Sequence, residues 1–112
     1  MKQAVRYPVL SVLLSIALFS AAAAPKASTK PHRVVIRNLK YEPAKITIKA
    51  GEAIQWVNED DHDHTVVAKD ESFESDNLGR DDAFRRVFTK PGKFEYFCRY
   101  HPRMKGTVTV EK

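Results

Sequence analysis

Apolar and polar residues alternate along much of the chain beyond residue 31, and this alternation predicts short β-strands. In segment 44–51, Ile46 and Ile48 alternate with Lys45, Thr47 and Lys49, and Val108 and Val110 have the same spacing near the C-terminus. A period of two places one set of side chains in the core and the other in solvent. No segment beyond residue 31 keeps a helical period for more than one turn. Strands are therefore expected at 32–38, 44–51, 53–58, 64–68, 83–89, 93–98 and 106–112.

Turn-forming residues separate these segments. Pro43 cannot donate a hydrogen bond to a neighbouring strand, so it marks the start or the edge of a strand. Pro91 and Gly92 favour a turn before the strand at 93–98. Segment 69–82 is polar, acidic and irregular, as expected of a solvated loop. About seven short strands joined by turns predict an all-β protein with one domain, an antiparallel β-sandwich.

The first 23 residues have the pattern of a secretory signal peptide. Lys2 and Arg6 precede an apolar run from Pro8 to Phe19, and small residues follow it. The run of about a dozen residues is too short to span a bilayer comfortably, although a short uncleaved anchor is the alternative. We therefore expect a cleaved signal peptide at 1–23, a polar lead segment at 24–31, a domain at 32–112 and a periplasmic location.

Composition narrows the classes of function. The chain has 112 residues, with 19 Lys and Arg against 14 Asp and Glu. Two of the basic residues lie in the predicted signal peptide, so the expected mature chain is mildly basic, which does not favour nucleic-acid binding. Cys98 is the one cysteine, so an internal disulfide is excluded. A domain this small often needs a metal ion or disulfides, and a lone thiol in an exported protein is unusual.

Cys98 is close in sequence to two other residues that can bind metals. His101 and Met104 follow it at intervals of three residues, so one tight loop can bring the three side chains together. A fourth ligand must come from a neighbouring strand. His64 and His62 are two residues apart, so on an extended strand both side chains point to the same face and either could supply it. Two His and one Cys in a plane with a weak axial Met form the copper site of blue electron-transfer proteins. A zinc site of the Cys and three His is the alternative, but it has no need of Met104.

Each of these residues also has a purely structural interpretation. Free Cys is among the most buried residue types and behaves as a small hydrophobe, and a Met at the end of a strand is usually part of the core. The regular spacing of Cys98, His101 and Met104, together with the predicted export, favours a metal site.

From about residue 32 to residue 112 the chain resembles the cupredoxins of the plastocyanin, pseudoazurin and amicyanin group. The similar pieces are YEPAKITIKAGEAIQWVN, HTVV, FTKPGKFEYFC and CRYHPRMKGTVTV, in that order. The two-residue gaps in the ligand loop are most similar to amicyanin. The resemblance implies a Greek-key β-sandwich with one copper ion at one end. It also implies that His64, Cys98 and His101 are the equatorial ligands, that Met104 is the axial ligand, and that His62 is a solvated loop residue.

The sequence departs from the family pattern in three places. Thr65 follows the first ligand where plastocyanins and amicyanins usually have Asn, whose backbone amide hydrogen-bonds the Cys sulfur. Thr keeps an amide and a hydroxyl, so altered support of the ligands is expected. The segment between His64 and Cys98 is shorter than in many relatives, and the run from Glu59 to Asp63 is more acidic.

The resemblance implies a soluble periplasmic carrier of single electrons, which we expect to be a monomer. A copper protein for storage, delivery or resistance is the main alternative, and a subunit of a larger oxidoreductase is another. No nucleophile–base pair is evident, so an enzyme is not expected. The basic residues Arg99, Arg103 and Lys105 flank His101 and would favour a redox partner with an acidic docking surface.

Overall fold

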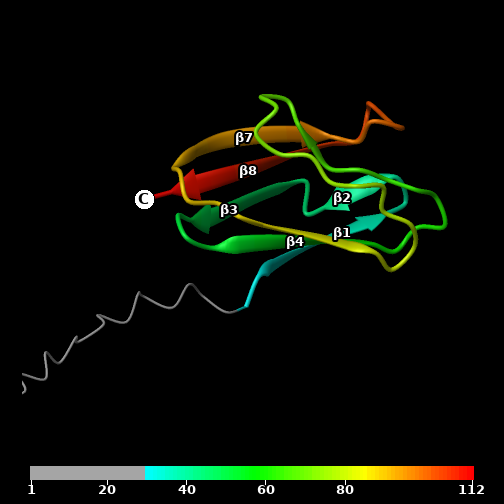
Figure 1. Ribbon diagram of the computed structural model, residues 1–112, viewed down its shortest axis with the longest axis horizontal. Coiled ribbons are helices and arrows are strands. Elements are labelled where there is room, and N and C mark those ends of the chain that lie inside the picture. The colour runs from blue at the N-terminus through cyan, green and yellow to red at the C-terminus, as the bar shows by residue number, and fades with distance from the viewer. Residues whose placement is uncertain (1–29) are drawn as a thin grey trace, which may run out of the picture.

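Residues 30–112 form two four-stranded β-sheets packed face to face in the computed structural model, which describes this part of the chain. The predicted signal peptide lies outside the described residues. Figure 1 shows the two layers, with the C-terminus at one end of the sandwich. Among residues 30–112 there is no helix long and apolar enough to cross a membrane.

The first sheet has the strand order β2-β1-β4-β6, and the second has the order β3-β8-β7-β5. Four of the strand pairings among the described residues are antiparallel, and two are parallel, β1 with β4 and β3 with β8. The predicted all-β sandwich is confirmed, and the parallel pairings are a feature that alternation alone does not give. The strands are β1 (His32–Arg37), β2 (Lys40–Glu42), β3 (Lys45–Lys49), β4 (Ala53–Asn58), β5 (Val67–Ala68), β6 (Ala83–Val87), β7 (Gly92–Phe97) and β8 (Lys105–Glu111).

Two strands differ from the expected segments. The short strand β2 was not predicted, because only Tyr41 within it is buried and three residues are too few to show a period. The expected strand at 64–68 is reduced to β5, and His64 instead forms an isolated bridge with Leu78. Segment 69–82 has no strand or helix, which confirms it as a loop.

The core is centred on Trp56, which is fully buried between the sheets. Its indole stacks on Phe84 with ring centroids 5.5 Å apart and meets Tyr96 edge-on at 5.4 Å. Tyr96 in turn lies directly against β8, where its cross-strand partner is Gly106. A Cβ atom at Gly106 would lie 2.2 Å from the Tyr96 ring, so only glycine fits at this position.

The connections at one end of the sandwich bring distant segments together. β4 leads into residues 59–64, and β7 ends immediately before Cys98. The loop 98–104 then returns to β8, which pairs with β7 from its first residue. The turn between β1 and β2 lies at this same end, away from the C-terminus (Figure 1). The candidate site is built where these loops meet.

Candidate metal centre

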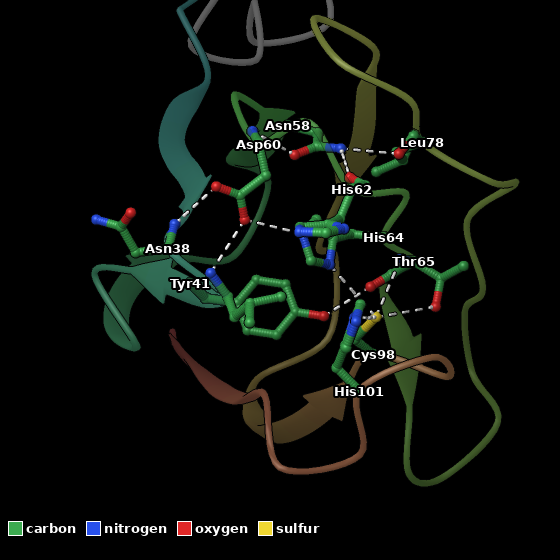
Figure 2. Close-up of polar contacts among 11 residues, drawn as sticks. Asn38, Tyr41, Asn58, Asp60, His62, His64, Thr65, Leu78, Cys98 and His101 are labelled. Atoms are coloured by element: carbon green, nitrogen blue, oxygen red, sulfur yellow. Dashed lines mark hydrogen bonds and ion pairs between the residues drawn. The ribbon is translucent and has the colours of Figure 1, made fainter.

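Three donor atoms meet between the loop 98–104 and the segment after β4. The Cys98 sulfur lies 3.7 Å from His64 Nδ1 and 3.7 Å from His101 Nδ1 (Figure 2). His64 and Cys98 are fully buried, whereas His101 is half-buried at the surface. Among the described residues this is the one group of three His, Cys, Asp or Glu side chains close enough to hold a metal ion.

The separations fit a single ion bonded to all three atoms. With metal–sulfur and metal–nitrogen bonds of about 2.3 and 2.05 Å, a trigonal angle places sulfur and nitrogen roughly 3.8 Å apart. Both observed separations, 3.7 Å, agree with that value. One thiolate and two imidazoles form a donor set that suits copper.

Met104 lies in the same loop and is buried, with 4% of its surface exposed. The loop is closed by its own backbone: Cys98 N–H donates to the Met104 carbonyl at 3.2 Å, and Met104 N–H donates to the His101 carbonyl at 2.8 Å. These two bonds hold the backbone of Met104 next to Cys98 and His101. The three-residue spacing in the sequence is therefore that of a compact hydrogen-bonded turn.

Thr65 links the two ligand-bearing segments. Its backbone N–H points at the Cys98 sulfur at 3.5 Å, and its hydroxyl accepts the Arg99 N–H at 2.9 Å. The hydroxyl also lies 3.9 Å from the sulfur, and the Thr65 carbonyl accepts the Tyr41 hydroxyl at 2.6 Å. The expectation that threonine offers an amide and a hydroxyl at this position is confirmed. An amide directed at the sulfur stabilises the negative charge of a thiolate.

Asp60 fixes the orientation of His64 from the far side of the ring. Its carboxylate lies 2.9 Å from His64 Nε2, which leaves Nδ1 free to face Cys98. The same carboxylate accepts the backbone N–H groups of Asn38 and Leu39 at 2.7 and 3.0 Å. Both of these residues have positive φ, 53° and 58°, so Asp60 also stabilises a left-handed turn.

The pKa values of His64 and Asp60 are both lowered. Burial lowers the pKa of His64, and the nearby Asp60 opposes that effect only in part. Burial acts to raise the pKa of Asp60, but the N–H groups of Leu39 and Asn38 and the His64 ring outweigh it. The lowered pKa favours the neutral imidazole of His64, the form that binds a metal.

Asn58 determines which histidine faces the site. Its side-chain amide donates to the His62 carbonyl at 2.8 Å and to the Leu78 carbonyl at 2.9 Å, while its oxygen accepts the Asp60 N–H. These bonds fix the backbone of the segment in which the His64 side chain is buried and the His62 side chain is exposed. In the sequence, the family spacing from Asn58 selects His64, but the hydrogen bonds of Asn58 and the contact of Asp60 with His64 were not predicted.

A thiolate-and-imidazole site at one end of a two-sheet β-sandwich defines a mononuclear copper protein of the blue type. A family model described as the cupredoxin-like domain matches residues 10–110. The chain therefore belongs to the cupredoxin family, and its cofactor is copper.

Among its relatives, amicyanin of Paracoccus versutus is 37% identical over 83 residues, which cover 70% of this chain and 63% of that protein. The match thus spans less than two thirds of that relative. Plastocyanin of Scenedesmus fuscus is 34% identical over 86 residues, covering 65% of this chain and 88% of the relative.

Solved structures agree with this assignment. The Cu(I) form of a single-site mutant of amicyanin superposes with a TM-score of 0.68 and 30% identity, covering 72% of this chain and 82% of that chain. A copper-containing nitrite reductase from Thermus scotoductus SA-01 has a TM-score of 0.70 at 30% identity. It covers 74% of this chain, but this chain matches only 23% of the reductase.

Proposed function

We propose that the protein is a soluble periplasmic carrier of single electrons, with His64, Cys98 and His101 as equatorial ligands of one copper ion and Met104 as the axial ligand. The observation that carries this proposal is the Cys98 sulfur with one imidazole nitrogen on each side at 3.7 Å. Bound copper supplies a one-electron change between Cu(I) and Cu(II).

The residues around the site favour rapid electron transfer. A thiolate and a thioether suit Cu(I), whereas imidazoles also suit Cu(II), so the set serves both oxidation states. Thr65, Asn58 and Asp60 hold the ligand-bearing segments by hydrogen bonds that need not change with the oxidation state. Burial of His64 and Cys98 excludes water from the inner side of the site.

His101 is the ligand through which we expect the electron to pass, because it is the half-buried ligand of the site. The charges around it favour an acidic partner. Among residues 30–112, ion pairs engage Glu59 with Arg33 and Arg37, and Asp61 with Arg80. Asp60 and Asp63 instead bond to the neutral side chains of His64 and Asn77. Arginines therefore compensate two of the four acidic side chains in this run.

The positive charges of the basic residues that flank His101 are only partly neutralised by ion pairs. Arg99 pairs with Glu74, but no ion pair within residues 30–112 involves Arg103 or Lys105. An excess of positive charge close to His101 would speed association with an acidic surface, and added salt would slow it. We further propose export with removal of residues 1–23, a domain at 32–112 and a monomeric protein.

Reconstitution of the metal-free protein with Cu(II) tests the function. An intense blue thiolate band and a reversible one-electron potential are expected. Cys98→Ser should abolish the band, while Ser75→Ala, a change in the same part of the fold, should retain it. A blue band that persists in Cys98→Ser would contradict the ligand assignment, and a site without reversible electrochemistry would contradict the carrier.

Copper storage or delivery is the second candidate, and one observation favours it. The exposed His62 ring lies 6.4 Å from His101, so a further donor stands at the entrance of the site. Ready loss of copper to a chelator from the reconstituted protein would support delivery. Slow loss together with rapid electron exchange would support the carrier.

A further inference from the structure

Three histidines that differ in exposure lie close together at the metal centre. His62 is exposed, His101 is half-buried and His64 is fully buried. The ring centroids of His62 and His101 are 6.4 Å apart, and those of His101 and His64 are 5.0 Å apart. Figure 2 shows His62 and His64 on one segment and His101 on the loop opposite. The His101 ring is thus close both to the buried ligand His64 and to an additional exposed imidazole, that of His62.

The two ring separations correspond to different arrangements around a metal ion. A metal–nitrogen bond of about 2.05 Å places the ring centre roughly 3.2 Å from the ion. Two imidazoles on opposite sides of one ion then have centres roughly 6.4 Å apart, and two at a trigonal angle have centres roughly 5.5 Å apart. The 6.4 Å between His62 and His101 leaves room for one ion between the two rings, and the 5.0 Å between His101 and His64 is closer to that of two ligands of the inner ion. A linear pair of nitrogen donors is a coordination that Cu(I) adopts readily.

The side chain of His62 is available for such a role. Its backbone carbonyl is fixed by Asn58, so the residue is held in place at the rim. Within residues 30–112 its imidazole makes no hydrogen bond, and its one ring contact is with His101. The neighbouring carboxylates of Asp61 and Asp63 are occupied by Arg80 and Asn77. The feature is therefore an imidazole site, which suits copper, rather than a carboxylate site for a hard cation.

We propose that His62 and His101 form an outer, transient site for Cu(I), through which the ion enters and leaves the inner site. This inference rests on the proposed function as a copper protein. As the ion moves inward, its outer bonds to His62 and His101 break, and bonds to the Cys98 sulfur, His64 Nδ1 and His101 Nδ1 form, while the proton of the thiol is released to solvent. The ion remains Cu(I) throughout, so no oxidant or reductant is needed.

Rates of copper exchange test the outer site. Metal-free wild type, His62→Ala and the control His32→Ala are mixed with a coloured Cu(I)–bicinchoninate complex, and the loss of its colour is followed. The control removes a histidine that is partly exposed and pairs with Glu52 outside the donor group. We expect His62→Ala to slow uptake, and withdrawal by excess chelator, by about tenfold, the effect typical of a residue that supports a site without being a permanent ligand.

The final state should not change, since a transient site alters rates and leaves the equilibrium alone. Equal rates for His62→Ala and wild type would overturn the proposal. A weaker equilibrium affinity in His62→Ala would also overturn it, because His62 would then be a permanent ligand. The blue band of the Cu(II) wild type separately tests the proposed function, so the failure of one inference can be told from the failure of the other.

A second measurement observes the outer site directly. In Cys98→Ser the inner thiolate is absent, and Ag(I) serves as a probe with the coordination chemistry of Cu(I) but no redox change. The ring nitrogen resonances of His62 and His101 should shift together on titration with Ag(I). Movement of the His101 and His64 resonances without that of His62 would overturn the proposal.

Discussion

Replacing Thr65 with Val isolates the contribution of one hydroxyl to the metal centre. Valine has nearly the same shape, so packing is preserved while the hydrogen bonds of Oγ1 are lost. The hydroxyl accepts the Arg99 N–H at 2.9 Å and lies 3.9 Å from the Cys98 sulfur. The backbone N–H of Thr65 still points at the sulfur, and its carbonyl still accepts the Tyr41 hydroxyl.

The loss of unfolding free energy in Thr65→Val is set by the Arg99 N–H, which loses its acceptor. Thr65 is 6% exposed, so little water can replace its hydroxyl beside the Arg99 amide. A buried backbone donor without an acceptor costs about 1–3 kcal/mol. Because Arg99 itself is exposed, we expect a value near the lower end, about 1 kcal/mol of unfolding free energy. For a domain of this size that loss corresponds to a midpoint about 4–8 °C lower.

Urea unfolding of the metal-free protein, followed by far-UV circular dichroism, measures this difference without the stabilisation that bound copper adds. Thr109→Val is the control, since Thr109 is half-buried on β8 and has no side-chain hydrogen bond within residues 30–112. The reasoning is refuted if the two variants are equally stable. With copper added, Thr65→Val should keep its blue band, because the amide directed at the sulfur is retained.

Three further predictions concern the other supports of the site and the core. Asp60→Asn should weaken copper binding about tenfold in chelator competition, since the charge that orients His64 is lost; an equal loss in the control Asp63→Asn would contradict this. Met104→Leu should keep the blue band and raise the potential measured by voltammetry, whereas loss of all copper binding would contradict the axial role. Burial raises the pKa of Tyr96 to about 12. An unfolded tyrosine ionises near pH 10, so Tyr96 alone should lower stability by as much as 1.4 kcal/mol per pH unit between about pH 10 and 12, and Tyr41, whose pKa burial also raises, should add to this. Tyr96→Phe should remove that part of the pH dependence, and an unchanged slope would be evidence against it.

The strand pattern predicted most of the sandwich, because alternation reports directly which side chains face the core. It could not predict which strands pair. β1 lies parallel to β4, and β3 lies parallel to β8, although each is far from its partner in sequence. These pairings depend on contacts between sheets and loops that no local period records.

The metal site, like the fold, was predictable from the sequence only in part. The spacing of Cys98, His101 and Met104 was readable because one loop holds all three residues. The choice between His62 and His64 could not be made from the residue pattern, because both side chains would point to the same face of a strand. Only the resemblance to cupredoxins favoured His64. In the structure His64 Nδ1 faces the Cys98 sulfur, and Asn58 fixes the backbone of this segment by bonding to the carbonyls of His62 and Leu78. A side chain that acts through tertiary hydrogen bonds leaves no periodic trace.

The close contact between Tyr96 and Gly106 limits how this sequence can change over evolutionary time. Because a Cβ atom at position 106 would lie 2.2 Å from the Tyr96 ring, any larger residue there requires a smaller side chain at position 96 first. That first step opens a cavity beside Trp56, in the middle of the core. The two positions are therefore expected to vary as a pair or to stay as they are, and a homologue in which one has changed alone should carry a compensating substitution near Trp56.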